Sequence, residues 1–155
     1  MKLYAGAVVR AANLPVHPLD FRATVTQIEE TLAALGERLG DQVDFSGTRA
    51  RAAALRDALE GLYGAAANAE TVDAARPVND ALLRIGRELV RVLYSSAGTF
   101  RQDPALHIPL LPELAAAADA VGKAPDGVVR TELVRGRNRL DAALDAATEL
   151  AEAVR

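Results

Sequence analysis

The sequence has no cysteine and no tryptophan, and only 4% of its 155 residues are aromatic. Without cysteine the chain forms no disulfide and offers no thiolate for catalysis, although its location stays open between the bacterial cytoplasm and secretion. Its longest apolar stretches are broken by charge well short of the roughly 20 residues that span a bilayer, so membrane insertion is not expected. The first residues carry no signal-peptide pattern and run directly into a helix-like segment, which suits a fragment of a longer protein.

Lysine and histidine are scarce as well. The net charge is −3, and Lys2 and Lys123 are the only lysines. A nucleic-acid binder carries a basic surplus, so no nucleic acid partner is expected. The only histidines are His17 and His107, and neither has a glutamate or a second histidine at helical ligand spacing. Zinc needs three or four converging ligands, so we predict no metal site in this chain.

Alanine and aliphatic residues are abundant, and 50% of the residues are hydrophobic. Alanine favours helix and supplies little volume, and no stretch shows the period-two alternation that is typical of a strand. The length suits a single domain over residues 1–155. The sequence predicts an all-α fold, an up-and-down helical bundle of about four main helices with short helices and one long irregular loop.

The strongest helical signal follows Asp20, which we predict to be an N-cap. Apolar residues then recur at steps of four and three, which forms one stripe packed against neighbouring helices, and Gly40 ends the helix. The stripe comprises Phe21, Val25, Ile28, Leu32, Leu35 and Leu39. A short first helix over residues 3–12 precedes it, and Pro15 and Pro18 predict an extended connection between the two.

Ser46 is predicted to cap a third helix, whose buried face carries Leu55, Leu59 and Leu62. Residues 64–76 fit either a continuation of helix or a loop. Pro77 is predicted to be the first residue of a fourth helix, because proline suits that position. The apolar stripe of the fourth helix comprises Val78, Leu82, Ile85, Leu89 and Val92.

The helical pattern fails from Ser95 to Pro112, and loops this long in compact domains are usually functional or mobile. A short helix over residues 112–121 follows and ends at Gly122. The last helix is predicted over residues 128–154, with Asp126 as a candidate cap. Its inward-facing residues are Val129, Leu133, Leu140, Leu144, Ala147, Ala151 and Val154.

No set of residues forms a recognisable catalytic centre. Ser95 and Ser96 lie in the long loop, but no Gly-x-Ser-x-Gly turn surrounds them, and a serine nucleophile needs a base and an orienting acid. We therefore predict no catalytic residue. The densest charge cluster is either a solvated face paired with Glu132 and Asp141, or a docking stripe for an acidic partner surface. It comprises Arg130, Arg135, Arg137 and Arg139 of the last helix.

Three segments resemble the transferrin-receptor-like dimerisation domain, which is the C-terminal helical domain of glutamate carboxypeptidase II-like zinc peptidases. Residues 11–21, AANLPVHPLDF, are similar to the family's Pro-Val-Leu-Pro-Phe-Asp segment before its long helix. Residues 79–87, NDALLRIGR, resemble its Asn-Arg-Ala-Leu-Met-Arg-Leu-Glu-Arg helix. The Arg-rich and Ala-rich last helix matches in position and character, so the resemblance covers essentially the whole chain.

The resemblance implies a domain that pairs two subunits of a larger peptidase and packs beside its own catalytic domain. The zinc ions of that family lie in the catalytic domain, which this chain does not contain. No cofactor is therefore expected here, and any peptidase activity belongs to the parent protein. In the family, the loop before the small helix approaches the substrate pocket. The matching residues here are Tyr94, Ser95, Ser96, Ala97, Gly98, Phe100 and Arg101.

Glutamate-preferring members of the family carry a Lys-Tyr pair where Ser95 and Ser96 stand here. Without the cation the loop has no natural partner for a carboxylate, which favours an aminopeptidase-like parent or one of unknown specificity. Two other interpretations stay open. One is a free-standing enzyme or small-molecule binder that uses the Ser95–Pro112 loop. The other is an amphipathic bundle for lipid surfaces, for which more lysine and more bulky apolar residues are expected.

Overall fold

The computed structural model describes residues 2–96, 102–103 and 107–154. Within these residues it contains six α-helices, one short 3₁₀ turn and no strand, which confirms the predicted all-α class. None of these helices is both long and apolar enough to cross a membrane. The elements are α1 (Lys2–Ala12), α2 (Arg22–Leu39), the 3₁₀ turn η1 (Gly40–Gln42), α3 (Ser46–Ala67), α4 (Val72–Leu93), α5 (Pro112–Asp119) and α6 (Asp126–Glu152).

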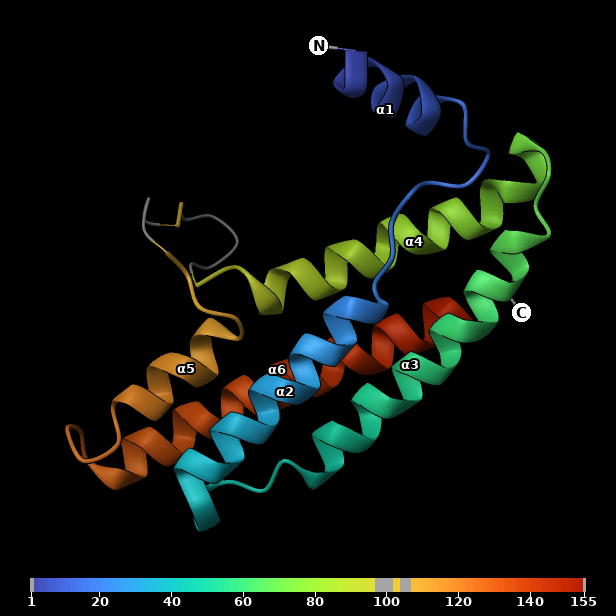
Figure 1. Cartoon of the computed structure of the whole chain (residues 1–155). Coiled ribbons are helices and arrows are strands. Elements are labelled where there is room, and N and C mark those ends of the chain that lie inside the picture. Colours follow the sequence, from blue (N-terminus) through green and yellow to red (C-terminus); the bar gives the residue numbers. More distant parts are fainter. Residues whose placement is uncertain (1, 97–101, 104–106, 155) are drawn as a thin grey trace.

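The four long helices α2, α3, α4 and α6 run alternately up and down, and α5 lies beside α6 at one end of the bundle (Figure 1). α6 is the central helix, because it packs against α3, α4 and α5. α3 and α6 run in the same direction. Arg137 donates to the Asp44 carbonyl oxygen at the start of α3 (3.4 Å). Two turns further along both helices, Arg51 binds the Asp145 carboxylate (3.0 Å).

The α2 stripe that the sequence predicts lies in the core. Its members from Val25 to Leu39 are buried, while Phe21 is half-buried at the start of the helix. Each buried aliphatic side chain contributes on the order of 1.5–3 kcal/mol, offset by the entropy of ordering it. Leucines of the other long helices fill the space opposite: Leu55, Leu59 and Leu62 of α3, Leu82 and Leu89 of α4, and Leu133, Leu140 and Leu144 of α6.

The starts of α2 and α3 differ from the prediction by one or two residues. Asp20 is not the N-cap of α2; its carboxylate accepts the backbone N–H of Arg22, the first helical residue, at 3.0 Å. Ser46 is itself the first residue of α3, and Asp44 accepts both its N–H (2.8 Å) and its hydroxyl (2.9 Å). Aspartate side chains bind the N–H two residues ahead in Asx turns, so an acid just outside each helix stabilises its start.

Residues 64–76, which the sequence leaves open, divide between two helices. α3 continues through the first part of this segment, and α4 begins at Val72 after a turn. The Thr71 hydroxyl accepts the Ala74 N–H at 3.2 Å and so caps α4. The prediction that Pro77 starts a helix is wrong, because this cap starts the helix earlier and Pro77 lies inside it. So close to the helix start, a proline removes one hydrogen bond without ending the helix.

In the C-terminal half the predicted helices are present, but their ends and some of their buried residues differ from the prediction. The α4 stripe ends on Leu93, which is buried, and not on Val92, which is half-buried. α6 begins at Asp126, which is its first residue and not its cap, although a carboxylate in the first turn still stabilises the helix dipole. Gly122 follows α5 with φ 73°, a conformation that glycine adopts without strain. Val154, predicted to face inward, is half-buried.

Candidate interaction surface

The connection between α4 and α5 contains the residues predicted to line a pocket, and its described residues form no helix. Asp103 holds the two serines of this connection. The Ser95 hydroxyl donates to one carboxylate oxygen (3.0 Å), and the Ser96 N–H and hydroxyl donate to the other (2.9 and 2.7 Å). One carboxylate thus fixes the start of the loop. Of the other predicted residues, Tyr94 is exposed, and Ala97, Gly98, Phe100 and Arg101 lie outside the described residues.

Ser95 and Ser96 border a groove of about 920 Å³ between the end of α4, the start of α5 and the middle of α6. Its apolar lining includes leucines of α5 and α6, and its charged lining residues have both signs. Glu113 of α5 and Arg139 of α6 form an ion pair across the contact between these helices. The remaining charged lining residues are Glu88 and Arg91 of α4, so the groove offers no excess of one charge to a ligand.

One wall of this groove depends on a close contact between α5 and α6. At Gly136 of α6, a Cβ atom would lie 3.0 Å from Cδ2 of Leu114, which is buried. Leu111, directly before α5, has a φ of 53°, which is strained for leucine. Its buried side chain and the hydrogen bond from its N–H to the Leu93 carbonyl (3.2 Å) hold this conformation. The start of α5 is therefore fixed against both α4 and α6.

The arginines predicted as a docking stripe on α6 are partly used within the bundle, as Arg139 at the groove shows. Arg135 pairs with Glu132 at 2.9 Å, as expected for a solvated face, whereas Asp141 pairs with none of the four. Arg137 donates to a backbone carbonyl at the start of α3. Arg130 is exposed and has no ion pair among the described residues. The docking role of this cluster stays a prediction.

The two histidines are exposed and lie in different connections, His17 before α2 and His107 before α5. Metal binding by a protein needs several ligands at one point. The described part of the chain contains no group of three or more histidine, aspartate or glutamate side chains placed to hold a metal ion.

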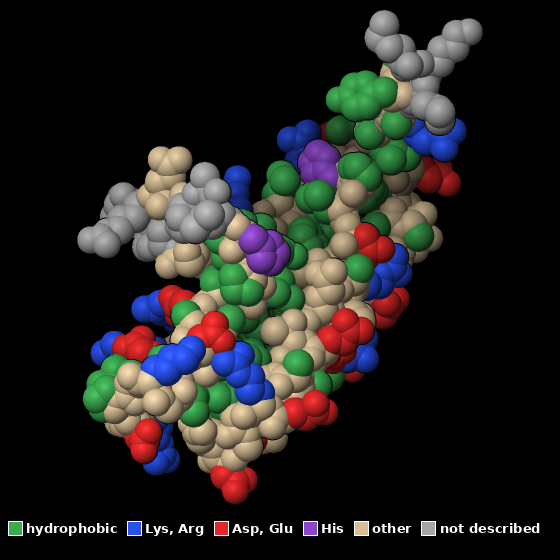
Figure 2. Space-filling model, turned by 60° about the vertical axis from the view of Figure 1, so that its left-hand side comes forward, with side chains coloured by type: hydrophobic (Ala, Val, Ile, Leu, Met, Phe, Trp, Pro, Cys, Tyr) green, Lys and Arg blue, Asp and Glu red, His purple; other side chains and the backbone are tan. Residues whose placement is uncertain are grey.

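Large apolar side chains are exposed mainly on α1, on the segment that follows it and along α4. Ten are exposed among the described residues, and nine of these belong to α1, to the segment after it and to α4 with the residue that follows α4. We call these nine the apolar surface: Tyr4, Val8, Val9, Leu14, Leu19, Val72, Leu83, Val90 and Tyr94. Figure 2 shows hydrophobic side chains gathered over the upper half of one face, with α1 at its top. The tenth residue is Val128 of α6.

α1 contributes to this surface because it does not pack along any other described helix, and its side chains from Tyr4 to Ala12 are exposed. It projects from the bundle on the strap, our name for residues 13–21, which crosses α4 (Figure 1). Asn79 of α4 holds the strap by its backbone. Its side chain accepts the His17 N–H (2.8 Å) and donates to the Pro15 carbonyl (2.9 Å).

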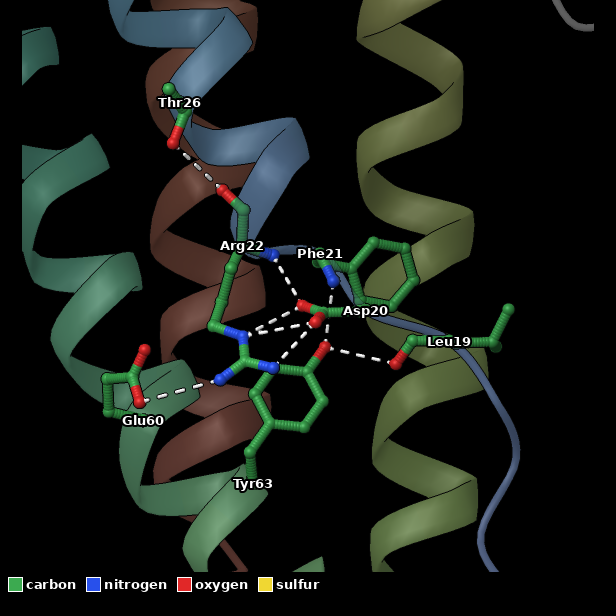
Figure 3. Close-up of polar contacts among 7 residues, drawn as sticks. All are labelled: Leu19, Asp20, Phe21, Arg22, Thr26, Glu60 and Tyr63. Carbon is green, nitrogen blue, oxygen red and sulfur yellow. Dashed lines mark hydrogen bonds and ion pairs between the residues drawn. The ribbon is translucent and has the colours of Figure 1, made fainter. Parts of the chain in front are cut away.

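Tyr63 of α3 holds the other end of the strap (Figure 3). Its hydroxyl accepts the Phe21 N–H (2.8 Å) and donates to the Leu19 carbonyl (3.1 Å), and burial raises the pKa of this phenol. The guanidinium of Arg22 lies 4.7 Å from the centre of the Tyr63 ring. The same guanidinium binds Asp20 at 2.6 Å and so lowers the pKa of that carboxyl. These contacts fix the strap, and with it the point from which α1 emerges.

The part of the apolar surface on α4 is missed by the sequence analysis, apart from Tyr94. Leu83, Val90 and Tyr94 recur at steps of seven and four, a helical spacing on the side opposite the buried stripe. A search for a second apolar stripe on the same helix would have found them.

Comparisons with known proteins assign no relative: no family model, no curated protein and no solved structure matches this chain.

Proposed function

We propose that this chain is a helical interaction domain without a catalytic centre, the dimerisation domain of a zinc-dependent exopeptidase. It packs against its own catalytic domain and against a second subunit. The observation that carries this proposal is the apolar surface, which gathers nearly all the exposed large apolar side chains of the described residues on α1, the strap and α4. Large exposed apolar patches mark sites of protein–protein contact, because leaving them in water costs free energy.

The state of α1 supports the same proposal. α1 has 11 residues, and an isolated helix shorter than about 12–15 residues is marginal in water. A partner that covers Tyr4, Val8 and Val9 would supply the packing that the bundle does not give. The sequence resemblance adds support, since it implies one contact within the subunit and one between subunits. Zinc would be held by the catalytic domain, and the parent would be an aminopeptidase or a carboxypeptidase.

A single-residue comparison tests the subunit contact. Val90 on α4 and Val128 on α6 are 52% and 54% exposed, but only Val90 belongs to the apolar surface. We expect the wild-type chain to dimerise in a concentration series measured by light scattering. Val90→Asp weakens this dimer at least about tenfold, because it places a charge in an apolar contact, while Val128→Asp leaves it unchanged. A monomer at every concentration, or equal effects of both substitutions, would contradict the proposal, as would turnover of a peptide by the purified chain.

The groove beside Ser95 and Ser96 favours a second candidate, a small-molecule binder, because its volume of about 920 Å³ suits a metabolite. A metabolite and metal screen by thermal unfolding separates the two candidates. Saturable stabilisation that Ser96→Ala or Arg139→Ala abolishes would favour the binder. An interaction domain is expected to show none.

A further inference from the structure

The outer face of α4 carries a row of arginines beside its apolar residues. Arg84, Arg87 and Arg91 are exposed, and none of them forms an ion pair within the described residues. We call these three the α4 ridge. Arginines elsewhere in the bundle are matched with carboxylates, among them Arg22, Arg38, Arg51, Arg56, Arg135 and Arg139. Asp80 and Glu88 of the same helix form no ion pair with a described residue either, so the α4 ridge leaves the outer part of α4 with a net positive charge in a chain of net charge −3.

The outer face of α2 carries an unmatched pattern of the opposite sign. Glu30 and Glu37 are exposed and form no ion pair with any described residue. The exposed residues that share this face are small or neutral, namely Ala23, Gln27 and Ala34, so another helix can approach closely. We call Glu30 and Glu37 with these three neighbours the α2 acidic stripe. Arg38, next to Glu37, is paired with Asp119.

The two patterns have the same spacing. Arg84 and Arg91 are seven positions apart, and so are Glu30 and Glu37. Seven residues make two helical turns, or about 10.5 Å, so one helix pairing brings both arginines to both glutamates. The two patterns lie opposite the buried stripes of their helices and thus face away from the core, and Arg91 also borders the groove beside α5 and α6. They cannot meet within one copy of the chain.

We propose that the α4 ridge of one copy binds the α2 acidic stripe of a second copy. This inference rests on the self-association proposed above and names the surfaces that make it. A two-fold axis forms the contact twice, since the ridge of each copy meets the stripe of the other. Leu83 and Val90, beside the arginines, then lie at the edge of the same contact. A nucleic acid or an anionic lipid would satisfy the ridge alone and leave both glutamates unpaired.

Charge reversal with rescue tests the proposal. The variants are Arg84→Glu with Arg91→Glu, Glu30→Arg with Glu37→Arg, and all four changes together. Each double variant places like charges opposite one another at four points of the dimer. We expect its dissociation constant, measured by analytical ultracentrifugation at low ionic strength, to rise at least about tenfold. The variant with all four substitutions restores opposite charges, and we expect its dissociation constant to recover to within about threefold of the wild-type value.

Asp57→Arg with Glu70→Arg is the matched control, because it makes the same change of net charge as the acidic-stripe variant at exposed residues outside the proposed contact. We expect it to change the dissociation constant by less than about threefold. The proposed contact is overturned if the control raises the dissociation constant as much as the acidic-stripe variant does, or if the variant with all four substitutions stays dissociated. A wild-type dimer insensitive to every reversal overturns this contact while leaving the proposed function standing. A wild-type chain that never dimerises removes both.

Discussion

The Tyr63→Phe substitution tests whether the strap depends on a single hydroxyl. It removes two hydrogen bonds, one from the Phe21 N–H and one to the Leu19 carbonyl. Leu19 is exposed, so water replaces its bond at a net cost of about 0.5–1 kcal/mol. The Phe21 N–H is partly buried, and leaving it unpaired costs about 1–2 kcal/mol. The ring under Arg22 stays, and phenylalanine and tyrosine have similar helix propensities, so the total is about 2 kcal/mol.

Urea denaturation measures this loss directly, and thermal unfolding should show a midpoint lower by about 5 °C for a domain of this size. Hydrogen exchange adds a local readout, because the amides of the first turn of α2 are expected to exchange faster. Tyr94→Phe is the matched control, since the Tyr94 hydroxyl is exposed and has no partner among the described residues. A loss below about 0.5 kcal/mol, or equal losses in the two variants, would refute the reasoning.

Two further predictions concern the α5–α6 contact and the start of α3. Gly136→Ala places a Cβ 3.0 Å from buried Leu114 and is expected to destabilise by about 1 kcal/mol, as overpacking exceeds the gain in helix propensity. Gly64→Ala in α3 meets nothing within 4 Å and is expected to stabilise by about 0.5 kcal/mol; changes of the same sign for the two variants in urea denaturation would contradict this contrast. The pKa of Asp44 is lowered mainly by the hydrogen bond from the Ser46 N–H and then by the bond from the Ser46 hydroxyl. The ionised carboxylate therefore stabilises the fold at pH values above the ordinary carboxyl pKa of about 4, and this stabilisation is lost as the pH falls. Asp44→Ala should therefore be less stable than wild type at neutral pH and approach it as the pH falls below the ordinary carboxyl pKa of about 4, and a difference that stays constant with pH would argue against this cap.

The sequence predicts the packing of the bundle better than the ends of its helices. The spacing from Phe21 to Leu39 identifies the buried face of α2, because helical periodicity is a property of many residues together. A helix end depends on one or two side chains. Asp44 and Ser46 both qualify as caps from composition, and only the backbone geometry shows that Asp44 is the acceptor. Thr71 likewise starts α4 ahead of Pro77, although proline is the stronger sequence signal.

The candidate surface was harder to predict, because it depends on what the folded chain leaves uncovered. Arg139 binds Glu113, which is 26 positions away, and helical spacing rules predict only neighbours three or four positions apart. The predicted docking cluster on α6 was therefore chosen by density of charge alone. The unmatched row on α4 becomes visible only after the ion pairs of the other helices are known.

The strap is bound through its main chain, so its position on the bundle does not depend on which side chains it exposes. Asn79 and Tyr63 form hydrogen bonds to backbone atoms of the strap, from 42 to 64 positions away along the chain. The exposed side chains Leu14 and Leu19 can thus be exchanged wherever the backbone stays extended, a shape that Pro15 and Pro18 favour, whereas Phe21 packs against the core. An engineer who wishes to redirect α1 should therefore redesign positions 63 and 79.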